Sequence, residues 1–325
     1  MSERPILIAG AGAIGSIVGA MLRRAGHEVT LLGRANHLEA IARDGLRISG
    51  LFGDRVASGF DLASDPADIK GHFDLILLTV KAYDTASMAD RVKHLLSSDG
   101  LIVAMQNGVG NLDVLVERVG PSRAIGARVM LGAEMHAPGH AHATVYGEPL
   151  AFGPSPSSNH QYCSPLFERA REVAAMLTAV GLASEVVPDI APLLWMKLFY
   201  NAALNPLGAL MRLNYGALAA DPDLRSTMDE VIEEAFAVAT ALAVALPHES
   251  AEAYREVFYG KLVPATFNHR PTMLYDLEQR GRTDIMEMNG KVVELAGRVG
   301  LRADTNRLLT HLIRARERMW RKEQS

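Results

Sequence analysis

The chain has 325 residues, of which 49% are hydrophobic and 22% charged, a composition typical of an ordinary globular protein. Its net charge of −4 gives no electrostatic basis for binding nucleic acid or an anionic membrane, and no apolar run is typical of a transmembrane helix. The single cysteine, Cys163, can form no internal disulfide and offers no thiolate cluster for a metal, which predicts a cytoplasmic location.

The start of the chain predicts a strand, a glycine turn, a helix and a second strand. The apolar run Ile6–Ala9 is followed by Gly10, Gly12 and Gly15 in the spacing G-x-G-x-x-G, and Glu28–Leu32 supplies the second strand. This context is the one that a dinucleotide-binding fingerprint requires. A secretory signal peptide is the competing interpretation, but the spaced glycines and the lack of a clear small-residue cleavage site favour a folded unit.

Each glycine of this turn has a separate physical role. Gly10 permits the tight turn, Gly12 lets a pyrophosphate approach the backbone, and Gly15 lets the helix pack closely on the strand. The helix that begins at Ala13 and Ile14 offers unpaired N–H groups and the positive end of its dipole to phosphates. We therefore expect these five residues to bind a dinucleotide cofactor.

The residue after the second strand indicates which cofactor is bound. An NAD site usually places an acid there to hold the ribose 2′-hydroxyl, whereas this chain has Gly33 and Arg34. A guanidinium suits a 2′-phosphate through charge-assisted hydrogen bonds, so Arg34 predicts NADP. The alternative is that Arg34 is only a solvated charge at a strand end.

Two further strands carry polar residues at their carboxyl ends. Phe73–Val80 and Leu101–Met105 are apolar runs typical of strands buried on both faces of a parallel sheet. Lys81 follows the first of them, and Asn107 follows the second within Gln106-Asn107-Gly108. Ligands bind beyond the carboxyl ends of strands in open α/β sheets. We therefore expect one site to gather the residues that follow such ends: Gly10, Arg34, Lys81 and Asn107.

The remaining elements of the first half are weaker predictions. We expect helices at 36–43, 84–96 and 166–180, strands at 46–49, 123–131, 143–152 and 184–187, and loops at 51–70 and 154–165. His136, His140 and His142 flank the turn signal Pro138-Gly139 and invite interpretation as a metal site. A surface turn is the favoured alternative, because no carboxylate or cysteine has ligand spacing nearby, so we predict no metal.

The pattern changes from Ile190 onward, where strand signals disappear and long helical patterns follow. Helices are predicted at 191–211, 223–245, 251–259, 283–299 and 305–322, with a loop at 263–271. The predicted fold is therefore a doubly wound, Rossmann-type α/β domain over residues 1–188, followed by an all-helical domain over residues 189–325. The last helix offers a surface for a homodimer, although its apolar stripe could equally pack on its own domain.

The first helix of this second half carries polar residues with potential chemistry. Ala191–Met211 is apolar nearly all round and is therefore expected to be buried, except at Lys197, Asn201 and Asn205. Their spacing of four residues aligns them on one face. A lysine that reaches solvent beside two structural asparagines is the simpler explanation for each residue taken alone. Three aligned polar residues on an apolar helix favour a row that faces a ligand, with a desolvated lysine as general acid.

The ordered set of motifs resembles the ketopantoate reductase family, which is NADP-dependent, over nearly the whole chain. The resemblance rests on GAGAIG from Gly10, Arg34, VKAYDT from Val80, QNG from Gln106, WMKLFYNAALNPL from Trp195, and PTMLYDLEQRGRTDIMEMNG from Pro271. It implies that a Rossmann domain binds NADP and that a helical domain binds the substrate. Catalysis is then expected to need closure between the two domains.

The resemblance also implies roles for individual residues. Lys197 matches the family's general acid, and Asn201 and Asn205 match asparagines that bind substrate. Asn107 matches a residue near nicotinamide and substrate, and Lys81 matches a lysine beside the cofactor. The family's serine and glutamate near the chain end correspond here to Thr272 and Asp284.

These two departures leave the substrate open. Thr272 keeps a hydroxyl for substrate binding, whereas Asp284 keeps the catalytic acid's charge and loses a methylene of reach. A favourable charge at a helix N-terminus is the alternative role of Asp284. The predicted reaction is hydride transfer from NADPH to ketopantoate, giving pantoate for pantothenate synthesis. The alternatives are a paralogue acting on another 2-oxo or 2-hydroxy acid and a non-catalytic NADP-binding sensor.

Overall fold

The computed structural model describes residues 5–154, 165–279 and 282–324. The chain forms two compact units, which are described separately. The first comprises the chain up to Gln106 together with Gly110–Ile190, and the second comprises Asn107–Val109 together with the chain from Ala191. Cys163 and most of the loop expected at 154–165 lie outside the described residues.

An eight-stranded sheet forms the centre of the first unit, in the order β12-β11-β8-β7-β6-β1-β2-β5. Its strands are β1 (Ile6–Ala9), β2 (Val29–Leu32), β5 (Asp61–Ala63), β6 (Phe73–Leu78), β7 (Leu96–Ala104), β8 (Ala124–Arg128), β11 (Leu150–Gly153) and β12 (Ser184–Val186). The strands from β8 to β5 run parallel, whereas β11 pairs antiparallel with β8. The central strands are buried on both faces, as their apolar runs predict.

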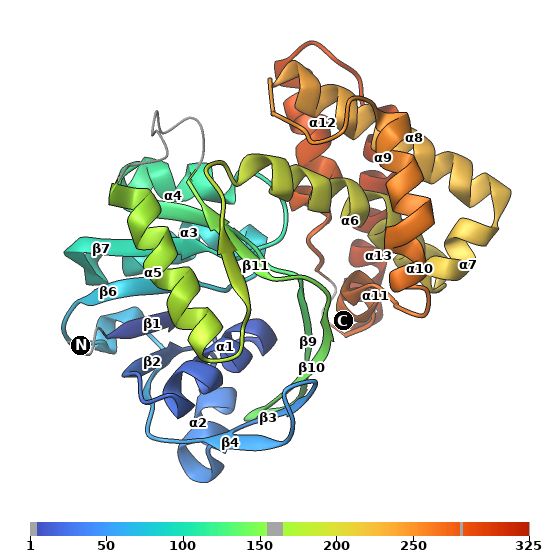
Figure 1. The fold of residues 1–325 in the computed structure, drawn as a ribbon. Helices are drawn as coiled ribbons and strands as arrows, with labels where there is room; N and C mark the ends of the chain where they lie inside the picture. Colours follow the sequence, from blue (N-terminus) through green and yellow to red (C-terminus); the bar gives the residue numbers. More distant parts are fainter. Residues whose placement is uncertain (1–4, 155–164, 280–281, 325) are drawn as a thin grey trace. The chain divides into compact units, whose positions relative to one another are not determined.

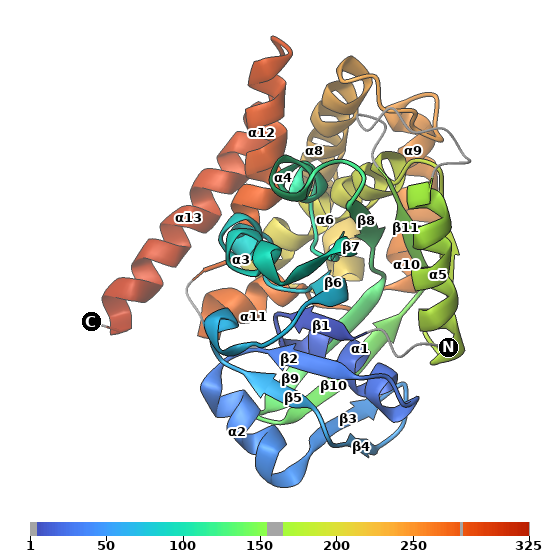
Figure 2. The same ribbon diagram turned by 90° about the vertical axis from the view of Figure 1, so that its left-hand side faces the viewer.

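Helices cover both faces of this sheet, which confirms the doubly wound α/β prediction (Figure 2). The helices are α1 (Ala13–Arg24), α2 (Ala35–Asp44), α3 (Thr85–Val92), α4 (Asn111–Val119) and α5 (Pro165–Ala179). Helices α1 and α5 lie on one face, and α3 and α4 lie on the other. The sequence pattern had not indicated α4.

The four central strands end at the same level of the sheet. Ala9 at the end of β1 is in register with Leu32 of β2 and with Leu78 of β6, and Leu78 is in register with Ala104 of β7. The chain segments that leave these strands therefore start side by side. Among the predicted site residues, Gly10, Arg34 and Lys81 belong to these segments.

A second sheet, which the sequence pattern did not predict, packs beside α1. Its order is β4 (Arg55–Ala57), β3 (Leu46–Gly50), β10 (His140–Tyr146) and β9 (Leu131–Ala137). Helix α1 contacts strands of both sheets (Figure 1). The region expected as loop at 51–70 thus contributes β4 and β5, and the single strand expected at 143–152 is divided between β10 and β11.

The buried side chain of His37, on α2, connects the second sheet to helix α1. The backbone N–H of Gly139, in the β9–β10 turn, donates to Nδ1 of His37 at 2.9 Å. An Nδ1 that accepts must carry no proton, so Nε2 carries it and donates to Oγ of Ser16 at 3.0 Å. Burial lowers the pKa of His37, in agreement with this neutral form.

The second unit is a helical cluster built around α6 (Figure 1). Its helices are α6 (Ala191–Met211), α7 (Tyr215–Ala220), α8 (Pro222–Ala241), α9 (Ala251–Val257), the π-helical turn η5 (Phe258–Leu262), α10 (Val263–Ala265), α11 (Thr272–Gln279), the 3₁₀ turn η6 (Ile285–Glu287), α12 (Asn289–Arg298) and α13 (Asp304–Gln324). Helix α6 has the predicted bounds and contacts α7, α8, α11 and α13. In the described residues no helix has the length and apolarity needed to cross a bilayer.

A proline in α6 determines how another segment packs against it. Pro206 lies inside the helix and has no N–H, so the carbonyl of Ala202, four residues earlier, lacks its helical donor. Nδ2 of Asn289 donates to that carbonyl at 3.0 Å and to Oδ1 of Asn306 at the same distance. Because Asn289 is fully buried, this replacement bond ties the start of α12 to the middle of α6.

Candidate functional site

The glycine turn after β1 leaves space where a phosphate would approach. Gly10 has a φ of +118°, and a Cβ there would lie 2.6 Å from the backbone nitrogen of Val80. A Cβ on Gly15 would lie 2.4 Å from the carbonyl oxygen of Gly10, so the helix packs tightly on the turn. In contrast, a Cβ on Gly12 would have no neighbour nearer than 4.0 Å. The close packing thus surrounds Gly10 and Gly15 and leaves the N-terminus of α1 open.

The N-terminus of α1 has the electrostatic character that a phosphate needs. Gly12 is the N-cap and provides no side-chain bond to the first N–H groups, which belong to Ala13 and Ile14 and the residues that follow. The first turn contains no acidic residue. The donors and dipole of α1 therefore remain available to an anion. The residues present fit a dinucleotide pyrophosphate.

Two basic residues follow neighbouring strands of the same sheet. Arg34 is the N-cap residue of α2, directly after β2 and Gly33, and its side chain is exposed. A Cβ on Gly33 would lie 2.9 Å from Cβ of Ala11, so the turn that carries Arg34 packs against the glycine turn. Lys81 is half-buried and begins the 3₁₀ turn at Ala82–Asp84. Both cations therefore lie in the segments that leave the central strand ends.

The second unit brings together two of the predicted catalytic and binding residues. Nζ of Lys197, on α6, donates to Oδ1 of Asn107 at 2.6 Å. An ammonium group only donates, so it must meet the amide oxygen of Asn107 and leaves the amide nitrogen directed elsewhere. Lys197 is half-buried, whereas Asn107 is exposed. The lysine is thus held at the surface of its unit by a defined acceptor.

The two asparagines of the α6 row have different environments. Asn201 is 8% exposed, and in the described part of the chain its amide makes no side-chain hydrogen bond. Asn205 accepts from the hydroxyl of Tyr215 at 2.7 Å and donates weakly to Sδ of Met288 at 3.7 Å. Burial raises the pKa of Tyr215 well above its usual value, so this hydroxyl remains a donor. Asn205 is therefore fixed by neighbours, and Asn201 is the more available amide for a ligand.

The predicted residues near the chain end lie on segments that pack against α6. Thr272 is exposed at the start of α11, and the preceding residue, Pro271, lies against Gly208 of α6. Asp284 is 7% exposed and is the N-cap residue of η6. Met288, four residues later, contacts Asn205. The structure therefore places the 284–289 segment along the polar row of α6.

Several polar residues in this region were not predicted as site residues. They are Gln106, Tyr215, Glu287 and Asn289. Gln106, the last residue of the first unit, is 7% exposed, and within the described residues neither polar atom of its amide has a hydrogen-bond partner. The sequence signal that could have identified Gln106 as a site residue was its position after β7 and next to Asn107. Tyr215 and Asn289 act on the row from other helices, for which a local pattern carries no signal.

The three histidines of the second sheet form a cluster without the geometry of a metal site. Oγ of Ser49 lies 2.8 Å from Nε2 of His140 and 2.9 Å from Nδ1 of His142. His136 stacks on His142 with a ring separation of 4.3 Å and an angle of 14°. Stacked parallel rings direct their in-plane lone pairs along parallel planes rather than at one ion. Among the described residues, no group of three or more His, Cys, Asp or Glu residues could hold a metal.

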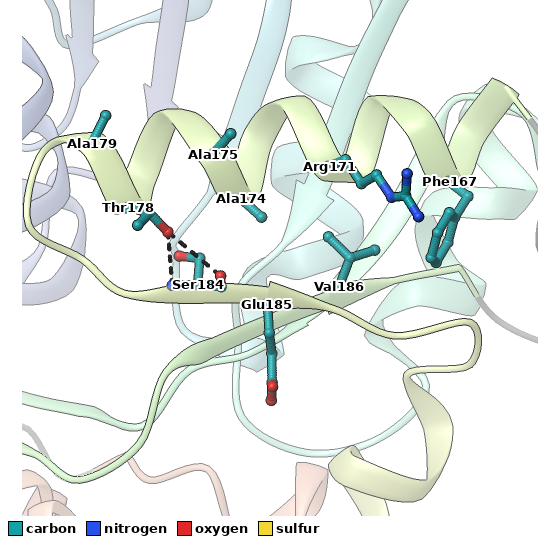
Figure 3. A pocket seen from close by; sticks show the side chains of 9 residues that line it. All are labelled: Phe167, Arg171, Ala174, Ala175, Thr178, Ala179, Ser184, Glu185 and Val186. Carbon is teal, nitrogen blue, oxygen red and sulfur yellow. Dashed lines mark hydrogen bonds between the residues drawn. The ribbon is translucent and has the colours of Figure 1, made fainter.

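An open groove of about 580 Å³ lies in the first unit, between α5 and the edge strand β12 (Figure 3). The polar side chains that line the groove interact with other residues of the first unit. Thr178 bonds the backbone of Ser184, and Arg171 pairs with Glu168 and lies over the ring of Phe167. No predicted site residue lines this groove. This groove therefore does not coincide with the residues predicted to bind cofactor and substrate, which lie at the strand ends and on α6.

Comparison with known proteins agrees with this fold. Residues 6–157 match the family described as ketopantoate reductase PanE/ApbA, and residues 189–317 match its C-terminal family. A 2-dehydropantoate 2-reductase of Aquifex aeolicus is 34% identical over 316 residues, covering 96% of each chain. A second, from Pyrococcus horikoshii, is 32% identical and covers 96% of this chain and 97% of its own.

Solved structures show the same fold. The PanE/ApbA family ketopantoate reductase of Ralstonia eutropha has a TM-score of 0.85 at 33% identity and covers 98% of this chain and 99% of its own. D-mandelate dehydrogenase, solved with NADH and anilino(oxo)acetate, has a TM-score of 0.86 at 23% identity with the same coverage. The protein is an oxidoreductase with a Rossmann-type unit followed by a helical unit. It belongs to the ketopantoate reductase family.

Proposed function

We propose that this protein reduces 2-dehydropantoate (ketopantoate) to pantoate with NADPH, a step of pantothenate biosynthesis. The observation that carries the proposal is the bond between Lys197 and Asn107 at the head of the polar row on α6. It presents an ammonium donor and an amide together, which is what a 2-oxo acid needs at its carbonyl. Relatives at 34% and 32% identity are 2-dehydropantoate 2-reductases.

The cofactor proposal rests on the first unit. Backbone N–H groups from Ala13 and Ile14 would hold the pyrophosphate at the open N-terminus of α1, where Gly12, without a side chain, allows its close approach. Arg34, which the sequence has where an NAD site carries an acid, would bind the 2′-phosphate of NADP. Lys81 and Asn107 are the further residues proposed to contact the cofactor. When bound, NADPH supplies a hydride to the substrate.

The side chains of the second unit would then carry out the proton chemistry. As the carbonyl carbon gains a hydride, its oxygen acquires negative charge, which the Lys197 ammonium stabilises and finally protonates. Asn107 accepts from Lys197 and so fixes where this proton is presented. Asn201 would orient the substrate, with Asn205 and Thr272 shaping its surroundings and Asp284 supplying the catalytic carboxylate. Because the glycine turn, Arg34 and Lys81 belong to one unit and the proton donor Lys197 to the other, neither unit alone would catalyse the reaction.

Thr272 and Asp284 are the residues that favour a second candidate, reduction of a different 2-oxo acid. The family's serine and glutamate are replaced at these positions, and the aspartate is shorter by one methylene. A non-catalytic NADP-binding sensor is a weaker candidate, because a sensor has no need of the Lys197 donor.

A homodimer and a cytoplasmic location stay predictions. The exposed side chains of Leu308, Leu312 and Met319 on α13 offer a surface for the former.

The test is NADPH oxidation with ketopantoate beside a panel of other 2-oxo acids, in wild type and in Lys197→Ala. We expect saturable turnover of ketopantoate, with kcat reduced by about 100-fold or more in the variant, as removal of general acid catalysis predicts. The Kd for NADPH, measured by fluorescence, should stay within about twofold. Turnover of another oxo acid, with ketopantoate poor, would support the second candidate. Equal loss of turnover and NADPH binding would contradict the role of Lys197.

A further inference from the structure

Glu287 lies beside the proposed substrate site and has no part in the roles assigned so far. It ends the 3₁₀ turn η6, and a Cβ on Gly108 would lie 2.3 Å from its carbonyl oxygen and 3.8 Å from its Cβ. Gly108 directly follows Asn107, the acceptor for Lys197. On its other side, Met288 contacts Asn205. The backbone of Glu287 is therefore fixed between the Asn107 turn and the polar row of α6.

The geometry of η6 brings the side chain of Glu287 to the same side as Asp284. The backbone N–H of Glu287 donates to the carbonyl of Asp284 at 3.1 Å, a bond that spans three residues. In a 3₁₀ turn, residues three apart eclipse each other. The two carboxyl groups therefore project from one face of the turn.

One oxygen of Glu287 is buried without a partner. The side chain as a whole is half-buried, but Oε2 is shielded from solvent and makes no hydrogen bond in the described part of the chain. Leaving a carboxyl oxygen in this condition destabilises a fold, so such groups are rare unless they serve a ligand. A hydroxyl group of a ligand would satisfy this oxygen.

We propose that Glu287 determines substrate specificity by binding, together with Asp284, a hydroxyl group at the end of the 2-oxo acid remote from the reacting carbonyl. This inference rests on the proposed function. A hydroxyl can donate to a carboxylate and accept from a carboxylic acid at the same time. A second carboxylate in the substrate could not, because it would meet the negative charge of Asp284. The site therefore selects hydroxylated oxo acids over those with an apolar end.

The charged groups around Glu287 determine whether its carboxyl group is neutral or ionised when the substrate binds. Burial and the neighbouring Asp284 raise the pKa of Glu287 from 4.5 to about 7, while Arg282 and Lys291 act in the opposite direction. Below pH 7 Glu287 is therefore neutral and can donate to the hydroxyl. As the pH rises through 7 it ionises, loses this donor and adds a second negative charge beside Asp284. Binding of the hydroxylated substrate should weaken over that range.

The experiment compares ketopantoate with its analogue in which a methyl group replaces the hydroxymethyl group. The ratio of their kcat/KM values is measured from pH 6 to pH 8.5 in wild type, Glu287→Leu and Glu287→Gln. In wild type we expect the ratio to favour ketopantoate and to fall about tenfold above pH 7. Glu287→Leu should lower the ratio about tenfold at pH 6. Glu287→Gln keeps a donor, so its ratio should stay high and become independent of pH.

The outcomes separate this inference from the proposed function. If Glu287→Leu keeps the wild-type ratio and its pH dependence, the inference is overturned while ketopantoate reduction stands. If the variant loses activity equally on both substrates and Glu287→Gln does the same, Glu287 has a structural role and the inference is again wrong. If wild type reduces neither compound although it binds NADPH, the proposed function fails and this inference fails with it.

Discussion

The bond from Asn289 to the carbonyl that Pro206 leaves without a donor makes a quantitative prediction. Replacing Asn289 with leucine keeps the side-chain volume and removes both donated bonds. The carbonyl of Ala202 and Oδ1 of Asn306 would then be deprived of their shared donor in a region where Asn289 and Asn306 are fully buried. We expect the helical unit to be destabilised as a result.

The magnitude follows from these contacts. A buried acceptor that loses its donor costs about 1–3 kcal/mol, so two acceptors cost about 2–6 kcal/mol. Oδ1 of Asn289 is buried and has no hydrogen-bond partner among the described residues, so its removal offsets about 1 kcal/mol of this cost. The expected loss in free energy of unfolding is therefore about 1–5 kcal/mol.

The assay is urea unfolding followed by tryptophan fluorescence. Both tryptophans of the chain, Trp195 and Trp320, belong to the helical unit, so the signal reports on that unit. Trp195 is 4% exposed and should respond strongly when the unit opens. The midpoint should fall in Asn289→Leu, with the slope against urea unchanged if the same surface is exposed.

A double-mutant cycle with Pro206→Ala tests the cause. Alanine restores an N–H at position 206, which gives the carbonyl of Ala202 its helical donor. In that background Asn289→Leu deprives only one acceptor, so its cost should fall by about 1–3 kcal/mol. If the two substitutions are instead additive to within about 0.5 kcal/mol, the reasoning about Pro206 and Asn289 is refuted.

Two further predictions concern the cofactor residues. Gly12→Ala places a methyl group in open space, so the melting temperature should change little while the Kd for NADPH rises about tenfold or more, measured by fluorescence titration; unchanged affinity would contradict the phosphate site. The matched control, Gly15→Ala, should lower the melting temperature, because its Cβ would lie 2.4 Å from the carbonyl oxygen of Gly10. Arg34→Ala should raise KM for NADPH about tenfold and leave KM for NADH unchanged, since only NADPH carries the 2′-phosphate. An unaltered ratio of the two KM values would show that Arg34 is only a solvated charge.

The sequence was most informative where a local pattern determines the structure. The glycine turn, β1, β2 and the bounds of α6 follow from short-range periodicity and from glycine spacing. The α/β architecture and the shared level of the central strand ends could be inferred for the same reason. Parallel strands with apolar runs have few alternative arrangements.

The features that escaped prediction depend on distant partners. Strands β3 and β4 are short and pair with each other. They join a larger sheet because β10 pairs with β3 from some ninety residues away in the chain, as the bond between Ser49 and His140 illustrates. Likewise, Pro206 shows that the carbonyl of Ala202 needs a donor, but nothing near it in the chain identifies Asn289. The sequence shows the row of polar residues on α6. It does not show the contacts with other helices that distinguish Asn201 from Asn205.

The assignment of Asn107–Val109 to the helical unit has a consequence for protein engineering. These three residues come from the middle of the sequence of the first unit, yet they provide the acceptor for Lys197, and Gly108 packs against Glu287. A fragment that begins at Ala191 would therefore lack part of its own site. The helical unit is not a portable module, and a chimera joined between Ile190 and Ala191 must take 107–109 from the same parent as the helices.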